Sequence, residues 1–263
     1  MILTGYSLIF VLLMMVWHWL CSKPDRQRTG WTIGTILICL PFALVANDLA
    51  DWIVLRFGAH ITWRYDLYVY GYDRLLGEPS FVIGRLVHSS RILTLVTDQV
   101  YGSCVGIMIV AFCVYVWLAF DEKFVVVRAF VLNLLCALPV YLMFPVCGPV
   151  YAFKDFPHAP GVVTSHIITL RDVPNGVPSI HNSNAMLFAA LMWRWKWGRI
   201  AGVVFVLATA FTTLGNGQHY FFDILCAVPY TCFVYRLSVV KFRDRPTLVR
   251  SDGGGGAAMP DLG

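Results

Sequence analysis

The chain has 263 residues, of which 58% are hydrophobic and only 13% are charged. A soluble domain is about 25% charged, so the composition excludes a water-soluble globule and also excludes disorder over most of the chain. The net charge of +5 does not indicate nucleic-acid binding, because the basic residues lie at the ends of apolar runs, where they orient membrane proteins. We therefore predict an all-α fold, a polytopic membrane bundle of about six or seven transmembrane helices.

The N-terminal part, residues 1–56, contains two apolar runs that we expect to be transmembrane helices. The run over residues 1–22 precedes its basic residues, whereas a cleaved signal peptide carries positive charge before its apolar core. It is therefore predicted to be a retained span with its N-terminus outside. The second run, residues 31–55, carries Asp48 and Asp51 near its far end. These acids indicate either a functional site or a helix end at the membrane interface.

Residues 57–98 mix aromatic residues with arginines and contain no stretch apolar enough to span. Tyrosine and tryptophan favour the headgroup level of a bilayer. We therefore predict an interfacial amphipathic segment, in which residues 80–97 form one amphipathic helix.

Residues 99–238 are predicted to form the catalytic membrane core. Its expected spans are residues 99–120, 124–146, 179–193, 200–214 and 218–236. A loop of about 30 residues, rich in proline and glycine, follows the second of these, and loops of that length are usually functional or disordered. Residues 239–263 are expected to be a cytoplasmic, disordered tail. The positive-inside rule then places the long loop and the 215–218 turn together on the outer face.

Three polar clusters interrupt the apolar sequence on this predicted outer face. They cover residues 144–153, 177–186 and 212–225. His219 and Asp223 are four residues apart, which places them on one face of a helix. An aspartate beside a histidine holds one imidazole nitrogen protonated and leaves the other free as a nucleophile or base. His181 lies in the first turn of another predicted helix, where backbone amides favour an anion.

Two histidines at two helix starts can flank one anionic group, and phosphoryl transfer needs a nucleophile, a proton donor and amides around such a group. Two alternatives stay open. The set of His181, His219 and Asp223 is also a plausible zinc site. The second alternative is a non-enzymatic lipid-binding or transport protein, although the sequence lacks the internal repeat that many transporters show.

At these residues the sequence resembles a known family. PSIH (178–181) followed by GQHYFFDIL (217–225) is similar to the type 2 phosphatidic acid phosphatase superfamily. The signature of that superfamily combines a Lys/Arg-Pro motif, a Pro-Ser-x-His motif and Ser-Arg-x5-His-x3-Asp. FPVCGP (144–149) and YDRLLGEPS (72–80) resemble its inositol phosphorylceramide synthase-like branch. The resemblance covers residues 70–236.

The resemblance implies a role for each site residue. His219 would be the nucleophile that forms a phosphohistidine, Asp223 would orient it, and His181 would protonate the departing alkoxide. No metal and no other cofactor is implied. The expected substrate-binding residues are Ser179, Gly217, Lys154 and Arg171.

Two positions depart from the family pattern. Thr213 occupies the position of the phosphate-binding arginine, and Val150 lies where the first motif has a base. The synthase-like branch also lacks that arginine, so the departure favours this branch. The phosphate charge is then left to other cations, for which the candidates are Lys154, Arg171, Arg85 and Arg91.

The implied activity is phosphoryl transfer on a membrane lipid through a phosphohistidine, as a lipid phosphatase or a head-group phosphotransferase. The expected substrate is a phospholipid or lipid phosphate, and the acceptor is water or an alcohol such as ceramide. We expect a multi-pass integral membrane protein whose active site faces the extracytoplasmic side, periplasmic or lumenal. We expect the protein to contact the lipid bilayer, and we expect no nucleic-acid partner.

Overall fold

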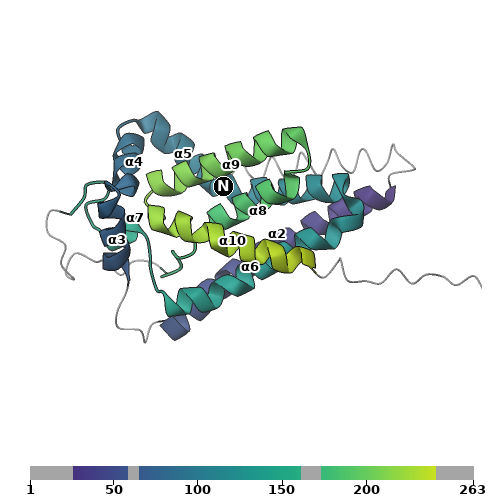
Figure 1. Ribbon diagram of the computed structural model, residues 1–263, viewed down its shortest axis with the longest axis horizontal. Coiled ribbons are helices and arrows are strands. Elements are labelled where there is room, and N and C mark those ends of the chain that lie inside the picture. Colours follow the sequence, from purple (N-terminus) through teal and green to yellow (C-terminus); the bar gives the residue numbers. More distant parts are fainter. Residues whose placement is uncertain (1–25, 59–64, 161–172, 241–263) are drawn as a thin grey trace, which may run out of the picture.

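The computed structural model describes residues 26–58, 65–160 and 173–240 (Figure 1). The elements are α2 (Arg26–Gly58), α3 (Asp66–Leu75), α4 (Pro79–His88), α5 (Arg91–Leu118), the 3-10 turn η2 (Phe120–Glu122), α6 (Lys123–Met143), α7 (Pro149–Ala152), α8 (Ile180–Met192), α9 (Lys196–Gly215) and α10 (Phe221–Val240). No strand occurs in these three stretches, so the predicted all-α class is confirmed.

The helices confirm a membrane protein. Three are long and apolar enough to cross a bilayer, namely Phe120–Met143, Lys196–Gly215 and Phe221–Val239. α5 makes a fourth if its two parts, bent by 47° between Cys104 and Gly106, cross as one span. The predicted second run lies within α2. The predicted first span, residues 1–22, and the C-terminal tail lie outside the described residues, so the number of spans remains a prediction.

The predicted single helix over residues 80–97 is wrong, because a break at Ser89 and Ser90 divides it into α4 and the start of α5. The Ser89 hydroxyl donates to the Leu86 carbonyl at 2.7 Å, and Ser90 is extended, with φ of −133° and ψ of 123°. Serine competes for backbone hydrogen bonds in this way, which favours helix ends over helix interiors. The next helix consequently begins at Arg91 rather than near residue 99.

α8 lies at the centre of the bundle and packs against α5, α6, α9 and α10. Aromatic and small side chains fill this core, among them Phe112, Ala185 and Phe188. Figure 1 shows the long helices running together, with α3, α4 and α7 gathered at one end. The α9–α10 connection lies at that same end, and the α8–α9 connection lies at the other.

Side-chain hydrogen bonds join α6, α8 and α10 within the bundle. Asn133 donates to Asn184 at 2.6 Å and accepts from Ser183 at 2.7 Å, and Thr231 donates to Ser183 at 2.9 Å. Polar contacts of this kind are common between membrane helices, where an unpaired polar group is costly. They fix the position of α8 relative to α10, the two helices that carry the predicted catalytic residues.

Candidate active site

The connection between α9 and α10 presents His219 beside Asp223. His219 lies just before α10, and Asp223 lies in the first turn of that helix. The Nδ1 atom of His219 is 3.3 Å from Oδ2 of Asp223. The same oxygen accepts the Tyr220 backbone N–H at 2.8 Å, which fixes the carboxylate. With Nδ1 beside the carboxylate, Nε2 is the nitrogen that we expect to take part in chemistry.

His181 lies next to this pair. It sits in the first turn of α8, and its ring centroid is 6.1 Å from that of His219. On its other side the ring of Tyr101 in α5 is 4.9 Å away. Reacting groups approach to about 3–3.5 Å, so one small group between the two imidazoles can contact both. The structure thus brings together His181, His219 and Asp223, as the sequence predicted.

Two polar atoms at this place lack a hydrogen-bond partner. Nδ1 of His181 and Oδ1 of Asp223 are both buried and unpaired. Buried polar atoms are rarely left unpaired in folded proteins. They are the atoms to which a bound substrate or water would offer the missing partner.

Burial determines the protonation of His219. Its side chain is only 5% exposed. Burial lowers the pKa of His219 to about 4, although a hydrogen bond with the Gly176 backbone opposes this shift. The imidazole is therefore neutral near pH 7, which is the form required of a nucleophile.

Neutral side chains occupy the place of the family's phosphate-binding arginine. The Thr213 hydroxyl donates to the Thr209 carbonyl at 2.8 Å and accepts from Asn182 Nδ2 at 3.1 Å. Asn182 Nδ2 also donates to the Ser179 hydroxyl at 2.9 Å. All four side chains are buried. A hydrogen-bonded chain from α9 to the start of α8 thus stands where the sequence pattern leads one to expect a cation.

Ser179 caps α8. It is extended, with ψ of 106°, and its hydroxyl accepts the Asn182 backbone N–H at 3.5 Å. Serine is a favoured helix cap for this reason. The cap is one of the two roles that the sequence suggested for Ser179, and phosphate binding by this residue stays a prediction.

Two glycines allow the first polar cluster to touch the histidine loop. Gly148 has a φ of +143°, and a Cβ atom there would lie 2.3 Å from the Gln218 carbonyl oxygen. Gly217 has a φ of +67°, and a Cβ there would lie 2.7 Å from the Phe156 ring. The Val150 N–H donates to the Gly217 carbonyl at 3.0 Å. Glycine is needed at both positions, because side chains do not tolerate this backbone or this proximity.

This contact also bears on the predicted role of Gly217. Its backbone N–H donates to the Leu214 carbonyl at 3.0 Å, and its carbonyl is taken by Val150. Both backbone groups therefore serve the fold of the loop. Substrate binding by Gly217 remains a prediction.

Sequence reasoning missed the role of Asp73, which it noted only within the YDRLLGEPS stretch. Asp73 is buried and accepts the Ser80 hydroxyl at 2.8 Å and the Phe221 N–H at 3.1 Å. It thereby ties the first turn of α4 to the first residue of α10. Burial raises the pKa of Asp73, and the hydrogen bonds from Ser80 and Phe221 oppose that rise. Phe221 lies two residues after His219, so this carboxylate positions the loop that carries His219.

Asp66 plays a similar part and was not singled out at all. Its carboxylate accepts the Cys147 N–H at 3.1 Å, the Gly148 N–H at 3.4 Å and the Tyr220 hydroxyl at 3.3 Å. It is buried at the start of α3. One side chain thus joins the first polar cluster to the residue after His219. An acid in a strongly aromatic segment was the only sequence signal for it.

Comparison with protein-family models matches residues 70–237 to a family described as the PAP2 superfamily. The chain belongs to the PAP2 superfamily. No match was found among curated proteins or among solved structures. Membership in the PAP2 superfamily indicates phosphatase-type phosphoryl transfer in general. The matched region runs from α3 to α10 and contains Asp73, both histidines and Asp223.

The cations that the sequence predicted for this PAP2 site are exposed where the structure describes them. Lys154 is exposed after α7, and Arg85 and Arg91 are exposed on α4 and at the start of α5. Arg171 lies outside the described residues. Within the described stretches, no group of three His, Cys, Asp or Glu side chains could hold a metal ion.

Proposed function

We propose that this PAP2 superfamily protein transfers a phosphoryl group of a membrane lipid through a covalent phosphohistidine at His219. The observation that supports this most is the spacing of the two imidazoles, whose centroids are 6.1 Å apart with Asp223 on the Nδ1 side of His219. A nucleophile, its orienting carboxylate and a second imidazole are thus side by side. This is the arrangement of activated nucleophiles in covalent catalysis.

The first step forms a bond between Nε2 of His219 and phosphorus. The bond from phosphorus to the lipid alkoxide breaks, its electron pair stays on that oxygen, and His181 donates a proton to it. Burial, and next to it the neighbouring His219, lower the pKa of His181 to about 3 without substrate, and the negative charge of a bound phosphate opposes this shift and favours the protonated form. Asp223 stabilises the charge that develops on the His219 ring through Nδ1.

The second step returns the enzyme to its starting state. His181 takes a proton from the acceptor hydroxyl, and the acceptor oxygen attacks phosphorus. The phosphorus–nitrogen bond breaks and its electron pair returns to Nε2 of His219. With water as the acceptor the reaction is that of a phosphatase. With a second alcohol it is a head-group transfer, for which water must be excluded.

We infer that the substrate is a phospholipid or lipid phosphate held at the extracytoplasmic face. Ser179, Gly217 and the cations Lys154 and Arg171 are the proposed binding residues. The neutral chain through Thr213 supports the inositol phosphorylceramide synthase-like branch, in which this arginine is also missing. A ceramide-type alcohol is the acceptor that this branch suggests.

Product analysis with purified protein in bilayers tests the proposal. Candidate phospholipids are supplied with and without ceramide or another alcohol. Free phosphate from a lipid phosphate, or a water-soluble phosphomonoester from a phosphodiester lipid, identifies water as the acceptor, and a new phosphodiester identifies a transferase. We expect His219→Ala and Asp223→Asn to lower turnover by about 10³-fold or more, as removal of a nucleophile or its orienting carboxylate does elsewhere. His158→Ala, at an exposed position, is the matched control.

Full turnover in His219→Ala would show that another residue is the nucleophile. Loss of turnover on chelation, with recovery on added zinc, would favour the metal alternative. Binding of phospholipid without any turnover under all conditions would favour a non-enzymatic lipid-binding or transport protein.

A further inference from the structure

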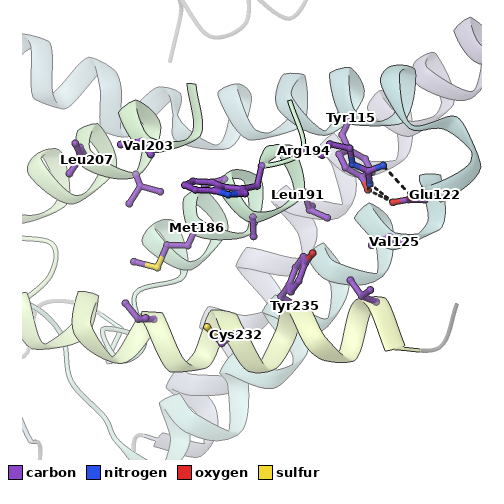
Figure 2. A pocket seen from close by; sticks show the side chains of 16 residues that line it. Tyr115, Glu122, Val125, Met186, Leu191, Arg194, Val203, Leu207, Cys232 and Tyr235 are labelled. Carbon is purple, nitrogen blue, oxygen red and sulfur yellow. Dashed lines mark hydrogen bonds and ion pairs between the residues drawn. The ribbon is translucent and has the colours of Figure 1, made fainter. Parts of the chain in front are cut away.

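A large groove lies along α8 on the side where α9 and α10 diverge. Both helices pack on α8 but scarcely touch each other. The space between them has a volume of about 1340 Å³. Figure 2 shows Met186 and Leu191 of α8 in the groove, with Leu207 of α9 on one side and Cys232 of α10 on the other.

The groove is apolar over most of its length and polar at one end. Its walls carry mainly valine, leucine, alanine and methionine side chains. At the polar end Arg194 donates to the Tyr115 hydroxyl at 2.8 Å and to Oε1 of Glu122 at 3.1 Å (Figure 2). The Arg194 and Glu122 side chains are 43% and 44% exposed, so this end is open. The groove thus has the chemical profile of an amphiphile, an apolar chain with a polar head.

The polar end carries a surplus of positive charge. Close along the chain to Arg194 and Glu122 lie Lys123, Lys196 and Arg199 against Asp121, and Arg28 lies 5.9 Å from the ring of the neighbouring Phe120. Trp193 and Trp197 are exposed there, and tryptophan favours the headgroup level of a bilayer. Basic side chains at that level attract anionic lipid headgroups.

This end is remote from the histidines. His181 lies in the first turn of α8, and Arg194 follows its last residue, Met192. A helix of 13 residues is ~20 Å long at 1.5 Å per residue. The polar end of the groove therefore lies at the opposite end of the bundle from the histidines, and a headgroup bound there does not reach His219.

We propose that the groove binds one anionic phospholipid from the leaflet opposite to the histidines. Its phosphate lies at Arg194 and the neighbouring basic residues, and an acyl chain lies on α8 between α9 and α10. This site is separate from the catalytic one and does not depend on the proposed reaction. Because this acyl chain would contact both α9 and α10, it would stabilise the relative position of the two helices whose connection carries His219.

Native mass spectrometry of the full chain tests this binding directly. The protein in detergent is titrated with phosphatidylglycerol or with phosphatidylcholine of the same acyl chains, and retained lipid is counted. We expect retention of one phosphatidylglycerol and about fivefold weaker retention of phosphatidylcholine, the contribution of one basic side chain near an anionic headgroup. The double variant Arg194→Gln/Glu122→Gln removes the ion pair without leaving a lone charge and should abolish this preference.

A matched pair of substitutions tests the place of the acyl chain. Val203 and Val204 are neighbours on α9 and both side chains are exposed, but Val203 lines the groove and Val204 does not. Val203→Trp should reduce retention of both lipids by about tenfold, and Val204→Trp should leave it unchanged. Cys232→Trp repeats the test from α10, at a position exposed enough to accept the larger ring.

Three results would overturn the proposal. Equal retention of the two lipids would exclude a site that selects an anionic headgroup. Unchanged retention in both Val203→Trp and Cys232→Trp would exclude the groove as the site. A change from dimer to monomer in these variants, without loss of lipid, would show that the groove is an interface between copies of the chain.

Discussion

The two ends of the bundle are built in opposite ways. At the histidine end, the buried carboxylates of Asp66 and Asp73 each accept several hydrogen bonds. At the Arg194 end, one exposed ion pair closes an open groove. Buried polar networks fix a geometry because each unmade bond is costly, whereas exposed ion pairs contribute little. The histidine end is therefore organised for fixed positions and the other end for exchange with the bilayer.

The largest expected effect on stability comes from Asp73. Asp73→Ala leaves the buried N–H and hydroxyl of Ser80 without their acceptor, and the Phe221 N–H keeps only the Ser80 hydroxyl at 3.0 Å. Each unpaired buried group costs about 1–3 kcal/mol, so we expect a loss of ~2 kcal/mol or more. Thermal unfolding in detergent measures it. Asp121→Ala, at an exposed acid, should leave the unfolding temperature unchanged, and an equal effect in the two variants would contradict the anchoring role.

A substitution at Gly217 should have a smaller effect. Gly217→Ala places a Cβ on a backbone with φ of +67° and within 2.7 Å of the Phe156 ring, which should destabilise the fold by ~1–3 kcal/mol and lower turnover. At Gly71 in α3, by contrast, an added Cβ would meet no other atom within 4 Å. Gly71→Ala should therefore be neutral or stabilising by ~0.5–1 kcal/mol. The idea of a tightly packed histidine loop fails if both variants unfold at the same temperature.

The ion pair at the other end should matter less for folding. Arg194→Gln/Glu122→Gln removes an exposed pair, and such pairs contribute about 0–1 kcal/mol. We expect a change in unfolding free energy below ~1 kcal/mol in detergent. A loss as large as that of Asp73→Ala would remove the contrast between the two ends.

The smallest expected change concerns acid pH. Since burial lowers the pKa of His219 to about 4, its neutral form persists at pH 5. Between pH 7 and pH 5 the fraction of nucleophilic imidazole should fall by less than about twofold, whereas a pKa near 6.5 gives a loss of about 25-fold. The acid limb of kcat/KM, measured with a phosphodiester whose own charge is constant, reports this value. A midpoint near pH 6.5 would mean that His219 is more exposed in solution.

Local patterns were sufficient to predict the all-α class and the proximity of His219 and Asp223. Apolar runs of sufficient length specify membrane helices, and the spacing of His219 and Asp223 places them together within one turn. The proximity of His181 followed from a resemblance between motifs rather than from spacing. The break at Ser89 and Ser90 was missed because apolar periodicity continues across it, whereas two adjacent serines are a local signal for a helix end.

Long-range contacts set the limit of sequence reasoning. Asp66 accepts hydrogen bonds from Cys147 and Tyr220, which lie 81 and 154 positions further along the chain. Asp73 accepts one from Phe221, which lies 148 positions further along. No local pattern relates such residues. The same holds for the chain through Thr213, where the sequence shows that the arginine is missing but not which side chains fill its place.

The bond from Asp73 to Phe221 has a consequence for how this protein can be divided. It joins a short helix that is not long enough to span the membrane to the last described membrane helix, across most of the sequence between them. A fragment beginning at α5 would keep both histidines and still lack the carboxylate that holds the loop of His219. The start of the family match at residue 70, inside α3, agrees with a unit of that extent.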